Sequence, residues 1–306
     1  MIHTVILGAE TPDAGELIRI LAMHPEIELE CAQSAQTGQR ALTAIHHGLI
    51  GETTLSTCVR PDCERCDMIF DFSEKGEPDL TGALGTAFPD AKVIRMRRCR
   101  TADNSDLWIY ALPEINRKAL VRGARYADMP SPLASMALVA LYPLALHMLL
   151  NGDLRLNFEA PQSIIDSTDV HDVEQEINEV LSRSQLSFNG SVSISLTPSD
   201  TRRSAVMSVD LPCTVDLDNL KQLYDIYDDH HFAFAVLGTT GPSEVAGTQK
   251  CVVALSKPAP DTVHVESVAD CRMRGGAGEA VHILNLMCGL HERTGLALKA
   301  IDFHPM

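Results

Sequence analysis

The stretch HTVILGAETPDAGELIRILAM, residues 3–23, begins the chain with an apolar strand, a glycine and an amphipathic helix. We expect the strand at 3–7 and the helix at 14–23, because Leu17, Ile18 and Leu21 fall on one face of a helix. A strand that turns through glycine into a helix is the repeating unit of parallel sheets. This stretch therefore predicts an α/β domain.

Further strands of the same kind follow along the chain. Apolar, β-branched runs predict strands at 28–32, 67–72 and 92–96, with helical or loop segments between them. Strands that alternate with helices form a parallel sheet covered on both faces. The segment 119–126 closes this unit. The sequence DMPSP at 128–132 ends it, because Pro130 and Pro132 stop a helix and bias the preceding residues to extended conformations.

The apolar run LASMALVALYPLALHMLL, residues 133–150, comes directly after this break. Its length just reaches that of a membrane-spanning helix. Tyr142, Pro143 and His147 interrupt the run, and Asn-Gly-Asp ends it. We therefore interpret it as a buried helix of a folded domain.

The second half of the chain has a different pattern. Val170, Val173, Ile177 and Leu181 form an apolar stripe on an acidic helix. Strands are predicted at 191–196, 205–210, 232–237, 250–255 and 262–267, and a glycine-rich turn at 275–278 begins a final helix. We expect an α/β domain at 1–128 and an α+β domain after it, from 129 on.

Composition excludes several classes of protein. The 306 residues include 41 acidic and 25 basic side chains, for a net charge of -16, and 5% are aromatic. Such a surface repels nucleic-acid phosphates and anionic lipids, and it offers few rings for base stacking. The N-terminus does not resemble a signal peptide, and the nine cysteines fit reduced thiols. We expect a cytoplasmic protein that binds neither nucleic acid nor membrane.

The turn after the first strand lies where a dinucleotide-binding fingerprint belongs. Glycines at such a turn let backbone amides and the helix N-terminus approach a pyrophosphate. Gly8 is in register, but Thr11 and Ala14 replace the other two glycines, and Glu10 and Asp13 place negative charge near the anion. A cofactor site and an ordinary strand-to-helix turn are both open interpretations.

Three cysteines gather in CVRPDCERC, residues 58–66. Cys58, Cys63 and Cys66 have a spacing from which thiolates bind zinc or an iron-sulfur cluster. The candidates for a fourth ligand are Cys31, Cys99, His46 and His47. A metal site and a cysteine-rich loop without metal both remain compatible with this pattern.

A dense basic patch, Arg95, Arg97, Arg98 and Arg100, lies at the end of the strand predicted at 92–96. The carboxyl ends of strands in an open α/β sheet face the ligand crevice, so these arginines suit a phosphate or carboxylate. A solvated loop explains the patch equally well.

Several motifs occur in one order along nearly the whole chain. They are GELIRILAMHPEIELE at 15–30, YALPEINR at 110–117, ALVALYPL at 137–144, GTQKC at 247–251 and SVADCRMRGGAGEAVHILNLMCGLHERTGL at 267–296. Together they resemble the N-acetyl-gamma-glutamyl-phosphate reductases, NADPH-dependent enzymes of arginine biosynthesis that share the aspartate-semialdehyde dehydrogenase fold. The resemblance implies a Rossmann-like nucleotide-binding domain at 1–128, with the C-terminal helix at about 277–306 packing on it. It also implies an α+β substrate and oligomerisation domain at 129–276.

The resemblance also locates the catalytic positions. Enzymes of this family attack an acyl phosphate with a cysteine thiolate and reduce the thioester with NADPH, while a histidine moves protons. Counting back from ALVALYPL puts Pro132 at the cysteine position, with Ser131 beside it. The family's His-x-His motif corresponds to residues 171–173, in which His171 survives and Val173 replaces the second histidine.

NADP is the cofactor that the resemblance implies. The residues we assign to it are Gly8, Thr11, Ala14, Gly15, Ser34 and Gly278. The Lys of the family's Lys-Gly-Ala persists only as Arg274.

The losses of catalytic residues predict a homologue that has kept the scaffold without the reaction. It would bind a small-molecule ligand or a related reductase subunit, and form a homo-oligomer, a dimer or a tetramer. The alternative is an active NADP-dependent reductase of N-acetyl-gamma-glutamyl phosphate or a related acyl phosphate.

Overall fold

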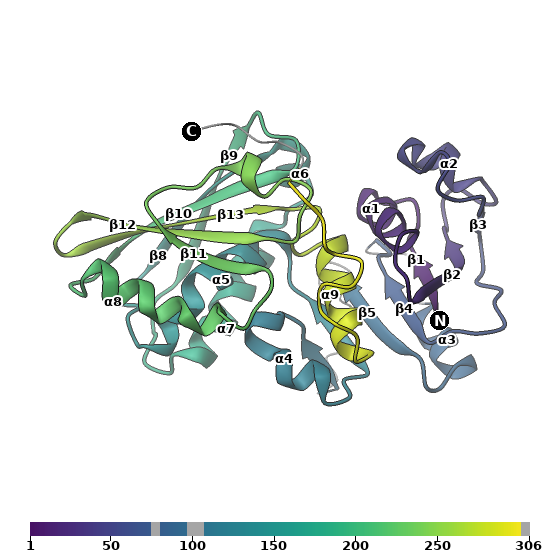
Figure 1. Ribbon diagram of the computed structural model, residues 1–306, viewed down its shortest axis with the longest axis horizontal. Helices are drawn as coiled ribbons and strands as arrows, with labels where there is room; N and C mark the ends of the chain where they lie inside the picture. The colour runs from purple at the N-terminus through teal and green to yellow at the C-terminus, as the bar shows by residue number, and fades with distance from the viewer. Residues whose placement is uncertain (75–79, 97–106, 301–306) are drawn as a thin grey trace. The chain divides into compact units, whose positions relative to one another are not determined.

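The computed structural model describes residues 1–74, 80–96 and 107–300 (Figure 1). The chain divides into two compact units, each with its own sheet. The first comprises Met1–Pro130 and Gly276–Ala297, and the second comprises Ser131–Gly275 and the described residues from Leu298 on. The boundary between Pro130 and Ser131 falls inside the proline-rich break, where a helix cannot continue.

The first unit is a parallel sheet with helices. Its elements are β1 (Ile2–Leu7), α1 (Pro12–Leu21), β2 (Ile27–Gln33), α2 (Leu42–Ile45), η1 (His47–Leu49), β3 (Thr57–Cys58), β4 (Met68–Asp71), α3 (Thr81–Ala87), β5 (Lys92–Met96), β6 (Trp108–Tyr110), α4 (Pro113–Val121), β7 (Tyr126–Met129) and α9 (Ala277–Met287). The seven strands lie in the order β3-β2-β1-β4-β5-β7-β6, and every neighbouring pair is parallel. The strand order reverses beside β1, which is where α/β sheets of this kind bind their ligands. The predicted α/β fold class is confirmed.

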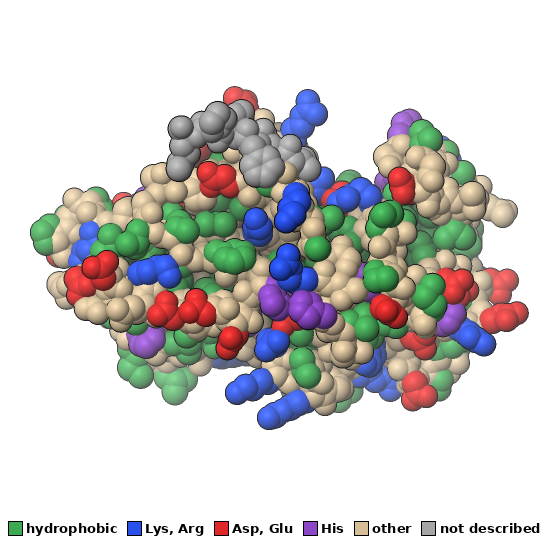
Figure 2. Space-filling view, in the orientation of Figure 1, with side chains coloured by type: hydrophobic (Ala, Val, Ile, Leu, Met, Phe, Trp, Pro, Cys, Tyr) green, Lys and Arg blue, Asp and Glu red, His purple; other side chains and the backbone are tan. Residues whose placement is uncertain are grey.

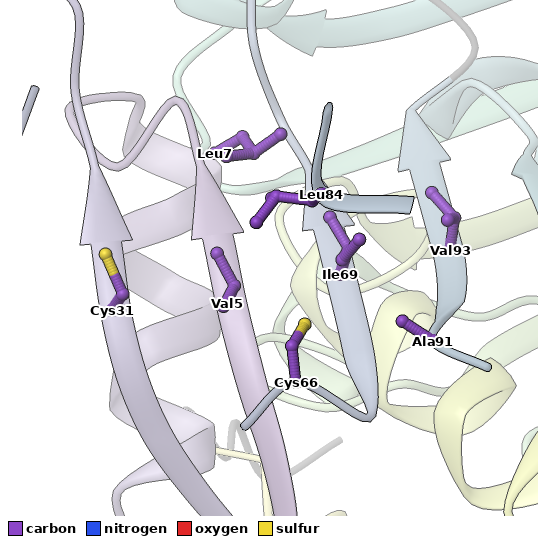
Figure 3. Close-up of a cluster of buried hydrophobic side chains, with 8 residues drawn as sticks. All are labelled: Val5, Leu7, Cys31, Cys66, Ile69, Leu84, Ala91 and Val93. Atoms are coloured by element: carbon purple, nitrogen blue, oxygen red, sulfur yellow. The ribbon is translucent and has the colours of Figure 1, made fainter. Parts of the chain in front are cut away.

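One face of this sheet carries a buried apolar cluster. Figure 3 shows Val5 of β1, Ile69 of β4 and Val93 of β5 side by side, with Leu84 of α3 beside them. These strands are apolar almost throughout, as expected for a sheet covered on both faces. Cys31 of β2 belongs to the same cluster.

Helix α9 joins the first unit from the far end of the chain. It packs against α1 and α4 and lies beside β5 (Figure 1). His24 and Asn285 bind each other through Nε2 and Oδ1 at 3.1 Å, and Lys92 donates to the carbonyl of Met287. The C-terminal helix therefore completes the fold that the N-terminal strands begin.

The second unit combines helices with a mixed sheet. Its elements are α5 (Pro132–Leu146), β8 (Leu154–Pro161), α6 (Gln162–Asp166), α7 (Val170–Ser184), β9 (Val192–Ser199), β10 (Ser204–Pro212), α8 (Leu217–Gln222), η3 (Leu223–Tyr227), β11 (Ala233–Leu237), η4 (Pro242–Glu244), β12 (Cys251–Ala259) and β13 (Thr262–Asp270). The strand order is β11-β12-β13-β10-β8-β9, with parallel pairs at both edges and antiparallel pairs between them. This agrees with the predicted α+β character.

Helix α5 is the centre of the second unit. Nearly all its residues are buried, which agrees with the interpretation of this run as a core helix, although the helix ends at Leu146. Pro143 lies inside it and has no N–H to donate to the carbonyl of Val139. The hydroxyl of Tyr227 donates to that carbonyl at 2.8 Å. None of the helices in the described part of the chain is long and apolar enough to cross a membrane.

The sequence missed several strands. β3 and β6 have two and three residues, too few to show a period. The segment 119–126 does not itself close the sheet, because α4 ends within it and β7 begins at Tyr126. β8 has a clear alternation of buried and exposed residues that the sequence reading overlooked.

Candidate functional site

The loop after β1 lies at the edge of the parallel sheet where the strands end, beside the point at which the strand order reverses. Gly8 begins it with a φ of 72°, and a Cβ at this position would lie 2.5 Å from the carbonyl oxygen of Phe72. A residue with a side chain would be strained there and would collide with the neighbouring strand end. Glycine is therefore required by the packing of the protein itself.

The start of α1 uses its own hydrogen-bond donors. Thr11 is the N-cap residue, and its Oγ1 accepts a hydrogen bond from the backbone N–H of Ala14 at 3.2 Å. The N–H of Gly15 donates to the carbonyl of Thr11, and Pro12 has no N–H. An anion at this helix start would therefore compete with the cap for donors.

Gln33, at the end of β2, binds the other side of the loop. Its backbone carbonyl accepts from the N–H of Ala9 at 2.8 Å, and its Oε1 accepts from Gly8 at 3.4 Å. Its Nε2 donates to the carbonyl of Val59 at 3.3 Å. Gln33 thus links the ends of β1, β2 and β3 at the edge where a cofactor would lie. No pattern in the sequence indicates this role.

Ser34 closes a local turn. Its Oγ accepts hydrogen bonds from the backbone N–H of Thr37 at 3.0 Å and from that residue's hydroxyl at 2.8 Å. Its own backbone N–H donates to the carbonyl of Cys58 at 2.9 Å. This arrangement shapes the turn after β2.

Gly15 makes room for a histidine. A Cβ on Gly15 would lie 2.5 Å from Nδ1 of His46. The Nε2 atom of the same ring lies 2.7 Å from the carbonyl oxygen of Ala9. His46 therefore supports the loop, and within the described residues it belongs to no group of three side chains close enough to share a metal ion.

Glu10 sets the electrostatics of the loop. Both of its carboxyl oxygens are inaccessible to solvent and have no hydrogen-bond partner. A negative charge in this place opposes a pyrophosphate, which the turn would otherwise attract through free amides. With Thr11 already capping α1, the residues present do not fit the pyrophosphate of a dinucleotide.

Arg95 is the part of the predicted basic patch that the structure describes. Arg97, Arg98, Cys99 and Arg100 lie outside the described residues. The Nε of Arg95 lies 3.2 Å from Oδ1 of Asp128, and its guanidinium carbon is 3.6 Å from the centroid of the Trp108 ring. The side chain is buried in these contacts. It is not part of a solvated loop.

The remaining residue assigned to a cofactor lies on another element. Gly278 is the second residue of α9 and is buried in the helix's first turn.

Figure 2 shows acidic side chains dispersed among basic and hydrophobic ones on the face in view.

The predicted metal site gains no support from the structure. Within residues 1–74, 80–96 and 107–300, the one group of three potential ligands close enough to share an ion is His3, Glu28 and Glu30. Cys58 lies against Cys31, with their Sγ atoms 2.7 Å apart. Cys66 is buried, and its Sγ lies 3.6 Å from the carbonyl oxygen of Met68. The expected convergence of Cys58, Cys63 and Cys66 on one ion is therefore not seen.

The start of α5 carries the predicted catalytic positions. Pro132 is the first residue of the helix and Ser131 is its N-cap residue, whose side chain makes no capping bond. The Oγ of Ser131 is buried without a hydrogen-bond partner. The backbone N–H of Ser131 donates to Oε1 of Glu176 at 3.1 Å. Gly275 has a φ of 64°, and a Cβ on it would lie 2.5 Å from the Cα of Pro132.

His171 and Val173 lie on different faces of α7. His171 is exposed in the first turn, whereas Val173 is buried with Ile177 in the core of the second unit. Residues two apart on a helix do not share a face. The side chains at these two positions therefore point in different directions.

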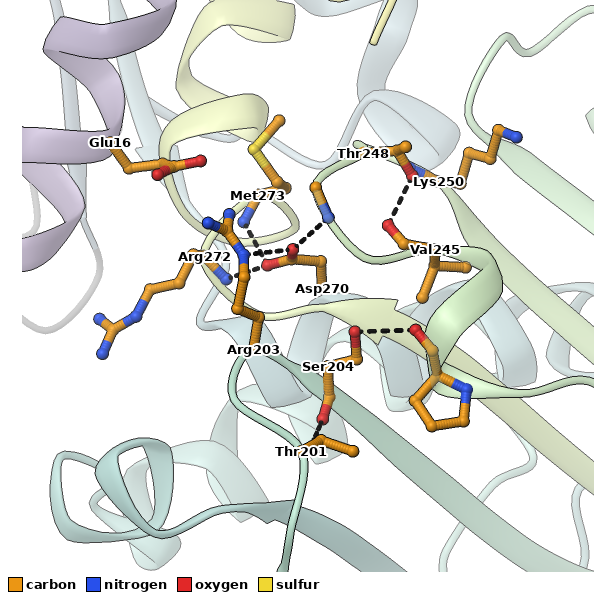
Figure 4. Close-up of polar contacts among 12 residues, drawn as sticks. Glu16, Thr201, Arg203, Ser204, Val245, Thr248, Lys250, Asp270, Arg272 and Met273 are labelled. Atoms are coloured by element: carbon orange, nitrogen blue, oxygen red, sulfur yellow. Dashed lines mark hydrogen bonds and ion pairs between the residues drawn. The ribbon is translucent and has the colours of Figure 1, made fainter. Parts of the chain in front are cut away.

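The buried carboxylate of Asp270 accepts several hydrogen bonds at the loop before α9. Asp270 accepts a hydrogen bond from Nε of Arg203 at 2.7 Å and from the backbone N–H groups of Gly247 at 2.7 Å and Arg272 at 2.9 Å (Figure 4). Arg274 follows and is buried, with its Nε donating to Oγ of Ser135 at 2.8 Å. Arg274 thus supports the first turn of α5.

A buried ionic network in the first unit was also missed. Glu292 accepts from Nε of Arg117 at 2.7 Å, and its Oε2 lies 2.8 Å from Nε2 of His282. Burial acts to raise the pKa of Glu292, but the hydrogen bonds and charges of His282 and Arg117 outweigh it and lower the pKa to about 2. Arg117 is 175 positions away from Glu292, so no local spacing links the two, although His282 and Glu292 are 10 positions apart.

No family model matches the chain. Among known sequences it is similar to the N-acetyl-gamma-glutamyl-phosphate reductase of Phocaeicola vulgatus, with 30% identity over an alignment of 331 residues that covers 99% of this chain and 100% of the relative. The reductase of the same name from Parabacteroides distasonis is 29% identical over 324 residues, with 99% of this chain and 100% of the relative covered.

Solved structures agree on the fold. Aspartate semialdehyde dehydrogenase II from Vibrio cholerae, complexed with ASA, gives a TM-score of 0.69 at 15% identity, covering 94% of this chain and 98% of that chain. Aspartate semialdehyde dehydrogenase with NADP from Candida albicans gives a TM-score of 0.68 at 11% identity, again with 94% and 98% covered.

Proposed function

Because the chain belongs to the N-acetyl-gamma-glutamyl-phosphate reductase family, we propose that it is a non-catalytic member that has kept the scaffold and acts as a binding protein. Its partner is a small-molecule ligand or a subunit of a related, active reductase. We place it in the cytoplasm as a homo-oligomer. The rival proposal is an active NADP-dependent reductase of N-acetyl-gamma-glutamyl phosphate or a related acyl phosphate.

The observation that carries this proposal is Pro132 as the first residue of α5. A cysteine at the start of a helix has a lowered pKa, because the positive end of the helix dipole stabilises the thiolate. Proline at the same position has no nucleophile and no N–H, and its fixed φ suits the first turn of a helix. The substitution therefore exchanges an activated nucleophile for a better helix start.

Neighbouring residues do not replace the missing thiol. Ser131 is adjacent, but the carboxylate of Glu176 binds its backbone N–H and makes no hydrogen bond with its hydroxyl. A serine without a base is a weak nucleophile. His171 is exposed on another element, α7, and Val173 fills the place of the second histidine with an apolar side chain.

The loop after β1 also supports a non-catalytic protein. A related fold has been solved with NADP, the Candida albicans dehydrogenase. In this chain Glu10 and the Thr11 cap do not fit a pyrophosphate at the start of α1. A protein that had given up hydride transfer would no longer need that loop to bind a dinucleotide.

Two measurements on the full-length protein test this proposal. Calorimetric titration with NADPH should give no saturable binding up to millimolar concentrations. An assay with N-acetylglutamate semialdehyde, phosphate and NADP should show no phosphate-dependent formation of NADPH. The Parabacteroides distasonis reductase, assayed in parallel, is the positive control. Micromolar NADPH binding together with turnover that Ser131→Ala abolishes would establish the rival proposal.

The partner is tested separately. The chain is mixed with the intact reductase of the same organism, and the mixture is analysed by size-exclusion chromatography with light scattering. A mixed oligomer would support the subunit form of the proposal. Two unmixed species would leave the small-molecule form, to be pursued by soaking candidate acyl phosphates and carboxylates.

A further inference from the structure

Two cysteines face each other across neighbouring strands of the first unit. Cys31 is on β2, and Cys58 is the last residue of β3, which pairs in parallel with β2 at the edge of the sheet. The register places Cys58 opposite Gln33. Side chains alternate between the faces of a strand, so Cys31, Gln33 and Cys58 all lie on one face.

The distance between the thiols is short. Their Sγ atoms lie 2.7 Å apart, and both cysteines are free. Thiolates that share a tetrahedral zinc ion, with Zn–S bonds of about 2.3 Å, lie about 3.8 Å apart. A disulfide brings the two sulfurs to about 2.05 Å. The geometry of the pair is thus closer to that of a disulfide than to that of a shared metal.

The two thiols differ in their access to solvent. Cys31 is buried, whereas Cys58 is half-buried on the edge strand. Burial, together with the hydrogen bond to Cys58, raises the pKa of Cys31 to about 12. An external oxidant therefore reaches Cys58 first, and Cys31 is the thiol in place to complete the bond.

We propose that Cys31 and Cys58 are a reversible dithiol–disulfide modification site, oxidised by a small disulfide of the glutathione type. The Cys58 thiolate attacks one sulfur of the oxidant, which forms a mixed disulfide and releases one thiolate. Cys31, on losing its proton to solvent, then attacks Sγ of Cys58 and expels the second thiolate. The protein is oxidised by two electrons, and one small disulfide is reduced to two thiols.

The disulfide between Cys31 and Cys58 would fix β3 to β2, next to the loop after β1. The carbonyl of Cys58 accepts from the N–H of Ser34, and the next carbonyl, of Val59, accepts from Gln33. Gln33 in turn binds Gly8 and Ala9. A covalent link between β2 and β3 therefore restrains the segment that holds the loop after β1.

Thiol mapping of the full-length protein tests this proposal. The reduced protein is incubated with glutathione disulfide, its remaining thiols are alkylated, and its peptides are analysed by mass spectrometry. We expect a peptide pair that links Cys31 to Cys58, loss of two of the nine thiols, and full recovery with dithiothreitol. Formation should quicken as the pH rises, because Cys31 must lose its proton. The oxidised protein should melt roughly 5–10 °C higher.

Variants separate this pair from its neighbours. Cys58→Ser should abolish the link, and it changes a half-buried position on the edge strand β3. Cys63→Ser is the matched control from the same loop and should leave the link intact, as should Cys213→Ser in the other unit. A link from Cys58 to Cys63, or no link in the wild type, would overturn the proposal. So would one zinc ion per chain that is lost in Cys31→Ser.

Discussion

Helices α1 and α5 both begin with a hydroxyl-bearing residue followed by proline, yet the two starts are built differently. Thr11 caps α1, with its side chain bound to the N–H of Ala14. Ser131 leaves its hydroxyl buried and unbound at the start of α5, while Glu176 holds its backbone N–H. A serine or threonine followed by proline therefore does not determine how a helix is capped. The surrounding residues decide whether the hydroxyl group binds a backbone N–H of the first turn.

The difference bears on function. At α1 the cap and Glu10 occupy the place of an anion, and the turn has become part of the protein's own hydrogen bonding. At α5 the side chain of Ser131 makes no capping bond, and Glu176 binds its backbone N–H. The two helix starts therefore differ in whether a hydroxyl side chain satisfies a donor of the first turn.

Removing the glycine that supports each helix start should give the largest effect. Gly8→Ala brings a Cβ to 2.5 Å from Phe72, and Gly275→Ala brings one to 2.5 Å from Pro132, both at positive φ. Strain and overpacking together should cost about 2–5 kcal/mol for each variant. Urea unfolding followed by circular dichroism measures the loss.

The controls for this pair are glycines with the same backbone conformation and open space. Gly38→Ala in the first unit and Gly152→Ala in the second meet no atom within 4 Å. They should lose only about 1–2 kcal/mol, from the left-handed conformation alone. If they matched the first two variants, close packing would not be what requires glycine at either helix start.

Acid should affect the unit that contains α1. The pKa of Glu292 is lowered to about 2, below that of an unfolded glutamic acid, so its ionised form stabilises the folded state. That contribution is complete above about pH 5 and is lost as the pH falls toward 2, a loss of about 2–3 kcal/mol. Urea unfolding at several pH values, followed by the fluorescence of Trp108, measures it.

Glu292→Gln tests the assignment of this pH dependence. The variant keeps the shape of the side chain and a hydrogen-bonding oxygen but cannot ionise. Its stability should be lower at pH 7 and should change less between pH 5 and 2. An unchanged pH dependence would assign the acid effect to other carboxylates.

The smallest effects give the most direct comparison of the two caps. Thr11→Ala should destabilise the protein by about 1 kcal/mol, because the N–H of Ala14 loses its partner. Ser131→Ala should be neutral or slightly stabilising, since it removes a buried hydroxyl without a partner. Thr11→Ser should restore most of the lost stability. Equal losses for the two alanine variants would show that both hydroxyls cap their helices.

The fold could be predicted from the sequence wherever a periodic pattern of apolar residues extended over many positions. The stripe from Val170 to Leu181 predicted α7, and the apolar run predicted α5 as a buried helix. Alternating strands placed β9 and β10 within a few residues. Short strands such as β3 depend on the neighbour that they pair with, so their own residues carry too little pattern.

The site was accessible only in part. Gly8, Thr11 and Pro132 were found because a motif or a resemblance fixes their positions along the chain. Gln33 and Glu176 could not be found, since their roles depend on atoms brought together by folding. The same holds for Cys31, which the sequence offered only as a candidate fourth ligand of a metal site and which the pairing of β2 with β3 places against Cys58.

The proline inside α5 makes one helix depend on a distant part of the chain. The carbonyl of Val139 has lost its usual partner to Pro143, and the hydroxyl that binds it belongs to Tyr227. During synthesis α5 leaves the ribosome well before Tyr227 has been made. The carbonyl of Val139 in the central helix of the second unit is therefore exposed to water until the later half of the domain has been synthesised and Tyr227 binds it.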